Sequence, residues 1–426
     1  MREVTLHEVC KLNGIQTGPF GSQLHQSDYS EQGTPVIMPV NLIDGCVSEN
    51  GIARVSEEHI ERLEKYKVST GDIVYSRRGD VGRCSRIGHK ESGWLCGTGC
   101  LRITPNPNAI NPDYLFYMLS LPSVIGWVRN NAKGTTMPNL NTEILSSVPL
   151  IIEESPEKQQ RIADTLKTYD SLIENNRKQI KLLEEAAQRL YKEWFIDLRF
   201  PGHETANINP ETGLPEDWTE SPLACLLEAQ IGGGWGEETL STEFSEMAYV
   251  IRATDIGDVE NGSLSNIPLR CHKPSNLASR ALRDGDIIFE VSGGSRDHGV
   301  GRNLRVTESL LSQLPFPVMC ASFCKKLRPK SEELSLLVAE SIRYAYLTEG
   351  LRVFEKRSAG NIINFHWDEF LDSFVLKIPP ANLLETFLKM VDSIHKSKML
   401  KASEMKLARE ARDRLLPKLM SGELEV

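Results

Sequence analysis

The sequence has no long run of apolar residues, although hydrophobic residues make up 40% of its 426 positions. A membrane-spanning helix needs about 20 such residues in a row, so no membrane span is predicted. The first residues, MREVTLHEVCKL, alternate charged and apolar side chains and lack the apolar core of a signal peptide. Nine scattered cysteines without an export signal are therefore expected to be the reduced thiols of a cytoplasmic protein.

Signatures of catalysis are also missing. There is no GxxxxGK[ST] phosphate loop, no HExxH pair and no specific Ser/His/Asp set. The segment NPDYLF (111–116) is similar to the Asn-Pro-Pro-Tyr signature of amino-methyltransferases, but Asp113 replaces the second proline and no Gly-rich cofactor loop precedes it. The sequence therefore predicts a non-catalytic protein that holds no cofactor of its own.

Two further patterns resemble sites without completing one. Cys96/Cys100 and Cys320/Cys324 have a C-x3-C spacing, yet they fall in predicted strands with no second ligand pair nearby. We interpret them as small buried hydrophobes and predict no metal site. The segment GGGWG (232–236) has no lysine and the wrong spacing for a phosphate loop, so a flexible loop is expected there.

A nucleic-acid partner is not obvious from the total charge, which is -9. Phosphate contacts need only a local basic patch, however. From Ser76 to Lys90 there are four arginines and one lysine against a single acid, Asp80. A solvated basic turn would explain this patch equally well when it is taken alone.

What the sequence does contain is a repeat. GDIVYSRRGDVGR (71–83) matches GDIIFEVSGGSRDHGVGR (285–302), and PVIMPVNLIDG (35–45) matches YVIRATDIGDV (249–259). In the same order, LCGTGCLRITPN (95–106) matches MCASFCKKLRPK (319–330), and LKTYDSLI (166–173) matches LKMVDSIH (388–395). The conserved order and divergent loops predict two copies of one α+β fold. In each copy, short strands precede a helix, which begins at Asn111 and Pro112 in the first copy and covers LSLLVAESIRYAYLT in the second.

Each copy is expected to end in a long helix. After Ser155 and Pro156, apolar residues recur at steps of four and three, with Asn176 as one polar position, which predicts a coiled-coil seam. The second helix starts alike and then loosens past His395. The predicted seam consists of Ile162, Leu166, Tyr169, Ile173, Ile180, Leu183, Leu190, Leu384, Leu388 and Val391. The predicted layout is a domain at 1–152, a long helix at 153–200, a linker and second domain at 201–378, and a long helix at 379–426.

The sequence resembles the specificity subunit of type I restriction–modification systems. The likeness is carried by GDIVYSRRGDVGR, by the segment from SPEKQQRIADTLKTYD to EWFIDLRFPG, by GLPEDW and by the terminal RLLPKLMSGELEV. The resemblance implies two target-recognition domains that each read half of a bipartite DNA site, separated by two long helices pairing as an antiparallel coiled coil with a pseudo-two-fold repeat. It also implies docking of two modification subunits, which carry S-adenosylmethionine, and of restriction subunits, which use ATP and Mg.

This plan gives the repeat a physical purpose. A helix of about 40 residues is roughly 60 Å long, and half-sites one DNA turn apart lie about 34–36 Å apart. Such helices are long enough to hold two reading domains a turn or more apart. Because the loops of the copies differ, the expected target is asymmetric.

DNA contacts are expected on matching loops of the two copies, where arginines grip phosphates or guanine and small residues allow close approach. Glu290 near the second loop is expected either to accept from cytosine N4 or to stabilise the loop by an ion pair. The predicted contacts are Ser76, Arg77, Arg78, Gly79, Arg83, Lys133, Thr135 and Thr136 in the first copy. In the second copy they are Ser292, Gly293, Ser295, Arg296, Arg302, Lys356, Arg357 and Asn361.

The acidic balance fits a subunit whose partners share the grip on DNA, and predicts weak, salt-sensitive binding by the isolated chain. The alternative is a protein–protein scaffold with repeated domains and an oligomerising coiled coil, which would show no dependence on DNA sequence. No side-chain code connects these loops to particular target bases.

Overall fold

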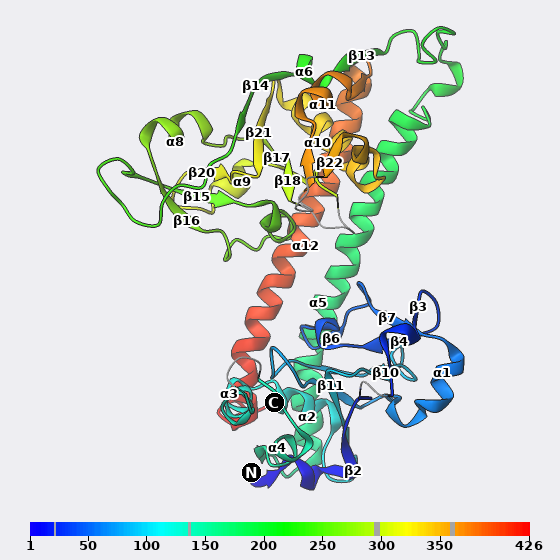
Figure 1. Cartoon of the computed structure of the whole chain (residues 1–426), viewed down its shortest axis with the longest axis vertical. Helices are drawn as coiled ribbons and strands as arrows, with labels where there is room; N and C mark the ends of the chain where they lie inside the picture. The colour runs from blue at the N-terminus through cyan, green and yellow to red at the C-terminus, as the bar shows by residue number, and fades with distance from the viewer. Residues whose placement is uncertain (21–22, 135–137, 294–298, 358–362) are drawn as a thin grey trace. The chain divides into compact units, whose positions relative to one another are not determined.

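The computed structural model describes residues 1–20, 23–134, 138–293, 299–357 and 363–426. The chain divides into two compact units. Unit 1 holds residues 1–173 and 407–426, and unit 2 holds residues 174–406. The long helices α5 (Pro156–Tyr191) and α12 (Ala381–Ser421) therefore each contribute to both units (Figure 1). Within the described ranges, no helix is both long and apolar enough to cross a bilayer.

Unit 1 is built on two four-stranded sheets. The first has the order β2 (Cys10–Thr17), β11 (Cys100–Pro105), β8 (Ile73–Ser76), β9 (Cys84–Arg86). The second has the order β10 (Leu95–Cys96), β4 (Thr34–Ile37), β7 (Ala53–Val55), β3 (Tyr29–Ser30). The small pairs are β1 (Arg2–Thr5) with β12 (Pro149–Ile152) and β5 (Leu42–Ile43) with β6 (Cys46–Val47). The short helices are α1 (Glu57–Arg62), α2 (Pro112–Leu119), α3 (Pro122–Asn131) and α4 (Thr142–Ser146).

Unit 2 repeats the strand order of the first sheet: β14 (Leu227–Gly232), β21 (Cys324–Pro329), β17 (Ile287–Glu290), β19 (Asn303–Arg305). A three-stranded sheet has the order β16 (Leu269–His272), β15 (Glu246–Ile251), β20 (Val318–Cys320). Another has the order β18 (Ser292–Gly293), β23 (Ile363–Phe365), β22 (Glu355–Arg357), and β13 (Thr219–Pro222) pairs with β24 (Val375–Ile378). The helices are α6 (Leu223–Leu226), α7 (Ile256–Glu260), α8 (Pro274–Arg280), α9 (Glu308–Leu311), α10 (Glu332–Leu347) and α11 (Trp367–Ser373).

Strand register follows the sequence repeat. Ile37 lies opposite Cys96 in the parallel pair β4–β10, and Ile251 lies opposite Cys320 in the parallel pair β15–β20. Isoleucine 37 and isoleucine 251 are the residues that the repeat aligns, as are the two cysteines. Corresponding residues therefore take corresponding places in two separate sheets.

The long helices are integral to the core of each unit. Ile162 and Leu166 of α5 and Leu416 and Leu419 of α12 are buried in the core of unit 1 together with the helices α2 and α3. In unit 2, Trp194, which follows α5, packs against Phe387 of α12 at a ring-centroid distance of 5.6 Å. Ten residues earlier, Glu184 Oε1 lies 2.5 Å from Lys398 Nζ, so the two helices run antiparallel in unit 2.

The predicted seam residues divide by burial. In α5, Ile162, Leu166, Ile173 and Ile180 are buried, while Tyr169, Leu183 and Leu190 are half-buried. In α12, Leu384, Leu388 and Val391 are buried, and the buried stripe continues past His395 as Lys398, Ala402, Met405 and Ala408. Asn176, the polar position, is also buried.

Two predictions about local structure need correction. The helix expected from Asn111 onward begins as predicted, since Asn111 Oδ1 accepts from Tyr114 N at 3.0 Å, but it breaks into α2 and α3 before Pro122. Proline disfavours helical backbone at the residue before it, and Leu121 is extended (φ -62°, ψ 135°). The paired cysteines do not share one strand: Cys96 ends β10 and Cys100 begins β11, with a turn between them.

Residues Gly233–Gly236 of the segment GGGWG form a loop outside any helix or strand, and this loop is closely packed at Gly233. A Cβ atom on Gly233 would lie 2.1 Å from the carbonyl oxygen of Ala321. The backbone N–H groups of Gly233 and Gly234 donate to the carbonyl oxygens of Cys324 and Cys320. Glycine is required here for close backbone approach.

Candidate nucleic-acid interface

In unit 1, the loop after β8 forms the centre of the predicted interface. Ser76 N donates to Arg83 O at 2.8 Å, which closes the loop at its base. Gly79 has a φ of +74°, a conformation that glycine adopts without strain. Arg78 and Gly79 are exposed at the tip of this loop, and Arg83 is exposed at its end.

The loop is tied to a second predicted segment. Leu140 N donates to Arg77 O at 2.9 Å, and Lys133 and Asn139 exchange two backbone hydrogen bonds. The exposed Lys133 is thereby held beside the loop after β8. Thr135 and Thr136, which were predicted as contacts, lie outside the described residues.

Two of the predicted contacts in unit 1 serve the loop itself. Ser76 is buried, and its hydroxyl donates to Arg78 O at 3.1 Å. Arg77 is only 9% exposed, and its Nε donates to Leu140 O at 3.2 Å. Direct contact with DNA is therefore better supported at Arg78, Arg83 and Lys133, for which it stays a prediction.

Arg77 is a buried cation without a carboxylate partner among the described residues. Burial, and secondly the charge of Arg78, lower the pKa of Arg77. No acceptor in the described part of the chain reaches the buried Nη1 atom of Arg77. An anion bound at this loop would relieve both effects.

Arg83 at the end of the loop has a half-exposed partner. Its Nε donates to Asp80 Oδ2 at 2.6 Å, and Arg129 Nη2 donates to Asp80 Oδ1 at 3.0 Å. Burial by itself would raise the pKa of Asp80, but the hydrogen bonds from both arginines lower it below its ordinary value. The carboxylate is thus charged at neutral pH and orients two exposed guanidinium groups.

In unit 2, the corresponding loop after β17 carries a different set of side chains. Val291 N donates to Phe323 O at 2.9 Å, as Arg77 N does to Gly99 O at 2.8 Å. Val291 therefore stands where unit 1 has Arg77. Ser292 and Gly293 form β18, which pairs with β23. Ser292 Oγ donates to Asn364 Oδ1 at 3.1 Å.

Arg302 is engaged in an internal ion pair. Its Nε and Nη2 donate to Glu290 at 2.9 and 2.7 Å, and Glu290 is only 1% exposed. These hydrogen bonds raise the pKa of Arg302 in spite of its burial. Of the two expectations for Glu290, the structure supports loop stabilisation, and Arg302 is correspondingly less available to DNA.

The remaining predictions in unit 2 divide into described and undescribed residues. Lys356 is exposed in β22, next to β23. The backbone of Arg357 ends the same strand. Ser295, Arg296 and Asn361 lie outside the described residues.

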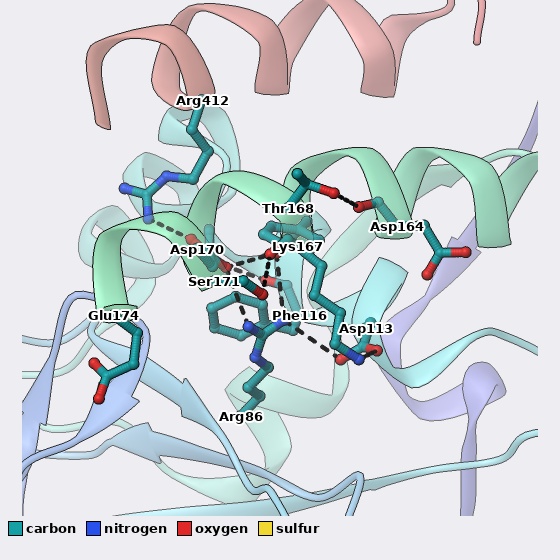
Figure 2. A network of polar contacts seen from close by, with 12 residues as sticks. Arg86, Asp113, Phe116, Asp164, Lys167, Thr168, Asp170, Ser171, Glu174 and Arg412 are labelled. Atoms are coloured by element: carbon teal, nitrogen blue, oxygen red, sulfur yellow. Dashed lines mark hydrogen bonds and ion pairs between the residues drawn. The ribbon is translucent and has the colours of Figure 1, made fainter. Parts of the chain in front are cut away.

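A partly buried polar network joins the domain of unit 1 to the long helices (Figure 2). Asp170 of α5 accepts from Tyr117 of α2 at 2.6 Å and from Arg412 of α12 at 2.7 Å. Arg86 of β9 lies 3.4 Å from Asp170 and 3.6 Å from Asp113. Burial and the charge of Asp170 raise the pKa of Tyr117, so its hydroxyl remains a donor. The domain of unit 1 is thereby fixed to both helices.

Unit 2 has its own network of buried charges. Arg343 of α10 pairs with Glu260 at the end of α7, and His395 Nε2 of α12 lies 2.8 Å from Glu340 Oε1. Lys398 of α12 is buried between Glu184 and Glu260. Its residues differ from those of the network in unit 1, but it likewise connects the domain of its unit to α5 and α12.

Nothing in the described residues forms a metal centre: no three His, Cys, Asp or Glu side chains there lie close enough to hold an ion. The paired cysteines are buried, and burial raises the pKa of Cys96 and of Cys320 to about 12. At neutral pH these side chains are therefore thiols, which are poor ligands and poor nucleophiles.

Sequence reasoning did not single out three aromatic side chains, two of which lie beside the loops after β8 and β17. Phe20 lies against Arg77, Trp235 lies against Arg270, and Phe323 is exposed next to Val291. The signal for the first two was present: a Gly-x-aromatic-Gly pattern follows the first sheet strand in each half of the sequence, as GPFG and GGWG.

Comparison with known proteins agrees with this arrangement. Residues 1–185 match the family model of the type I restriction modification DNA specificity domain. The chain is 23% identical over 381 residues to the type I restriction enzyme MjaIX specificity subunit of Methanocaldococcus jannaschii, covering 88% of this chain and 83% of the relative. It is also 23% identical over 413 residues to the HindI specificity subunit of Haemophilus influenzae, covering 84% of this chain and 88% of the relative.

A solved structure shares the fold. The S subunit of a type I restriction–modification system from M. genitalium aligns with a TM-score of 0.55 at 14% identity, covering 98% of this chain and 96% of that one. The repeated four-stranded sheet, the loops after β8 and β17 and the long helices thus occur in a chain whose relatives named above are all specificity subunits of type I systems. Residues 1–185 are thus similar to the type I restriction modification DNA specificity domain, and most of the chain is similar to specificity subunits of type I restriction enzymes.

Proposed function

We propose that this chain is the non-catalytic subunit that reads a bipartite, asymmetric DNA target, with each unit reading one half. The proposal rests on one observation: a loop of the same kind follows corresponding strands of the repeated four-stranded sheet, β8 in unit 1 and β17 in unit 2. Its backbone is anchored identically, through Arg77 N in unit 1 and Val291 N in unit 2. Two copies of one scaffold with different loop side chains suit two half-sites of different sequence.

The chemistry of the loops supports an asymmetric target. In unit 1 the loop presents Arg78 and Arg83, which suit phosphate or guanine. In unit 2 the loop presents Ser292 and Gly293, while Arg302 is held by Glu290. Different donors at corresponding places read different base edges.

We further propose that α5 and α12 pair along their length as an antiparallel coiled coil that relates the units by a pseudo-two-fold repeat. In this proposal the helices dock two modification subunits, and restriction subunits join the complex. S-adenosylmethionine, ATP and Mg belong to those partners. Exposed leucines on both helices support a docking role: Leu172 and Leu182 on α5, Leu400 and Leu407 on α12.

The proposal is tested by mapping methylated adenines in a methylation-free host. The host expresses the adjacent modification subunit with or without this chain. We expect an asymmetric bipartite motif, methylated in both halves, only when the chain is present. An active modification complex that yields no chain-dependent motif would favour the scaffold alternative.

A further inference from the structure

An aromatic side chain stands at the same place in both units. Phe20 follows β2 and Trp235 follows β14, the strands that begin the corresponding sheets. Two residues before each aromatic, a glycine N–H donates to the first residue of the neighbouring strand. Gly18 N donates to Cys100 O at 3.0 Å, and Gly233 N donates to Cys324 O at 2.9 Å.

Both glycines are fixed by close backbone contact. A Cβ atom on Gly18 would lie 1.9 Å from Gly97 O, and one on Gly233 would lie 2.1 Å from Ala321 O. Distances this short exclude any side chain at either position. The chain therefore leaves each sheet along a fixed path, which determines where the aromatic residue emerges.

Each aromatic is partly exposed and carries a guanidinium group over its ring. Phe20 is 48% exposed, and Arg77 Cζ lies 5.2 Å from its ring centroid. Trp235 is 39% exposed, and Arg270 Cζ lies 4.7 Å from its ring centroid. The arginines come from different elements, the loop after β8 and the strand β16. The same arrangement, a guanidinium group over a partly exposed ring, is therefore formed in the two units by arginines at positions that do not correspond.

Phe20 lies beside the loop proposed to read DNA in unit 1, and Trp235 follows a strand that is hydrogen-bonded to the start of β21, next to the residue that anchors the loop of unit 2. Phe20 contacts Arg77, whose neighbour Arg78 is exposed at the tip of the loop. In unit 2, Gly233 N donates a hydrogen bond to Cys324 O. The carbonyl oxygen of the adjacent Phe323 accepts a hydrogen bond from Val291 N, at the start of the loop after β17. A partly exposed ring next to a cation suits nucleic acid, because bases stack on the ring while the cation attracts phosphate.

We infer that Phe20 and Trp235 are equivalent DNA-contacting residues, each packing its ring against a base of the half-site that its own unit reads. This inference rests on the proposed function and adds the aromatic contact to it. The arginine behind each ring orients the aromatic and contributes charge; it does not itself read the base.

The experiment uses the full chain in complex with its modification subunit and a duplex that carries the methylated sequence. Phe20→Leu and Trp235→Leu keep an apolar side chain and remove the aromatic face. Stacking on aromatic side chains contributes enough that each variant should bind about tenfold more weakly. Phe20→Tyr and Trp235→Phe should bind within about twofold of wild type, since they retain an aromatic ring. Leu12→Ala and Val353→Ala, which shorten exposed apolar side chains elsewhere in units 1 and 2, are the matched controls.

The salt dependence of DNA binding separates a stacking contact from a phosphate contact. Loss of stacking leaves the slope of log K against log salt unchanged, whereas loss of a phosphate contact reduces it by about one. Leucine variants that bind like wild type, or that bind weakly with a reduced slope, would overturn the inference. If the wild-type complex itself shows no preference for the methylated sequence, the proposed function fails and the inference falls with it.

Discussion

Arginines at matching positions of the two units have different roles. Arg83 and Arg302 each follow a Val-Gly pair at the end of the reading loop. Arg83 pairs with the half-exposed Asp80, whereas Arg302 pairs bidentately with the buried Glu290. An exposed pair contributes little to stability, but a buried carboxylate that loses its partner is costly.

Arg302→Ala should therefore lower the free energy of unfolding by about 3 kcal/mol, because it leaves Glu290 charged and buried. Arg83→Ala, the matched change in unit 1, should lower it by less than about 1 kcal/mol. Urea unfolding of the two variants measures both values. Equal losses would contradict the structural role assigned to Arg302.

Arg78→Ala tests the phosphate contact of unit 1. Arg78 is exposed at the loop tip, so its loss should weaken DNA binding by the complex and reduce the salt slope by about one. Lys11→Ala is the control: it removes an exposed charge at the start of β2 and should leave the salt slope unchanged. An Arg78 variant with the wild-type slope would show that this loop does not contact phosphate.

The positions of the loops after β8 and β17 could be predicted from sequence, but the burial and the partners of each arginine could not. The Gly-Asp and Val-Gly-Arg patterns mark the loops in both halves. Arg77 is buried because the carbonyl of Leu140 and the ring of Phe20 lie against it. Both partners are distant in sequence, so local patterns do not reveal the contact. The same reasoning explains why Phe20 and Trp235 were missed.

At the scale of elements, buried polar networks hold each domain to the helices. In unit 1, Asp170 is the acceptor shared by the domain and α12, through Tyr117 and Arg412 (Figure 2). In unit 2, Glu260 faces Arg343 of α10 and Lys398 of α12. Such networks fix the orientation of each domain on the helices and add to its stability.

Asp170→Asn should lower the free energy of unfolding by about 3 kcal/mol, since Arg86 and Arg412 would lose their common carboxylate. Asp164→Asn makes the same chemical change at an exposed position of α5 and should cost less than about 0.5 kcal/mol. Denaturant unfolding compares the pair. A small loss at Asp170 would mean that the domain is held to the helices by apolar packing alone.

The pH dependence of unit 2 should follow Glu260. Burial alone would raise the pKa of Glu260, but the charges of Arg343 and Lys398 lower it below 4.5. A carboxyl with a lowered pKa adds stability above its ordinary pKa, and this stability is lost as the pH falls through the lowered value. Glu260→Gln should therefore be less stable than wild type at pH 7, and the difference should shrink as the pH falls from the ordinary pKa of a glutamate through the lowered pKa of Glu260.

Unfolding free energies measured from pH 7 to pH 3 test this expectation. The exposed Glu246→Gln is the control and should track wild type throughout. A Glu260→Gln deficit that persists unchanged at pH 3 would show that the loss arises from packing and not from the ion pair.

Helix starts were predictable because capping is local, and helix interruptions were less so. Ser155 Oγ accepts from Lys158 N at 3.2 Å at the start of α5, as the Ser-Pro sequence indicates. The break before Pro122 was hidden by the apolar run on both sides of it. The buried stripe of α12 past His395 was also unclear, because it contains Lys398 and small alanines.

At the scale of the whole molecule, the account requires the two units to act on different halves of one target. A substitution in one unit should then affect the reading of one half-site only. A change of bases in one half-site should leave the contact between the other unit and the other half-site intact. Of the predicted DNA contacts, Ser292 and Lys356 lie in unit 2, and Arg78 and Lys133 lie in unit 1.

The most direct measurement is binding of the complex to four duplexes: the methylated target, the target altered in either half, and the target altered in both. The wild-type complex is compared with Arg83→Ala in unit 1 and with Ser292→Ala in unit 2, the side chains proposed to face base edges. We predict that the first variant becomes insensitive to base changes in one half only, and the second to changes in the other half only. If both variants lose discrimination at the same half, the division of the target between two units is contradicted.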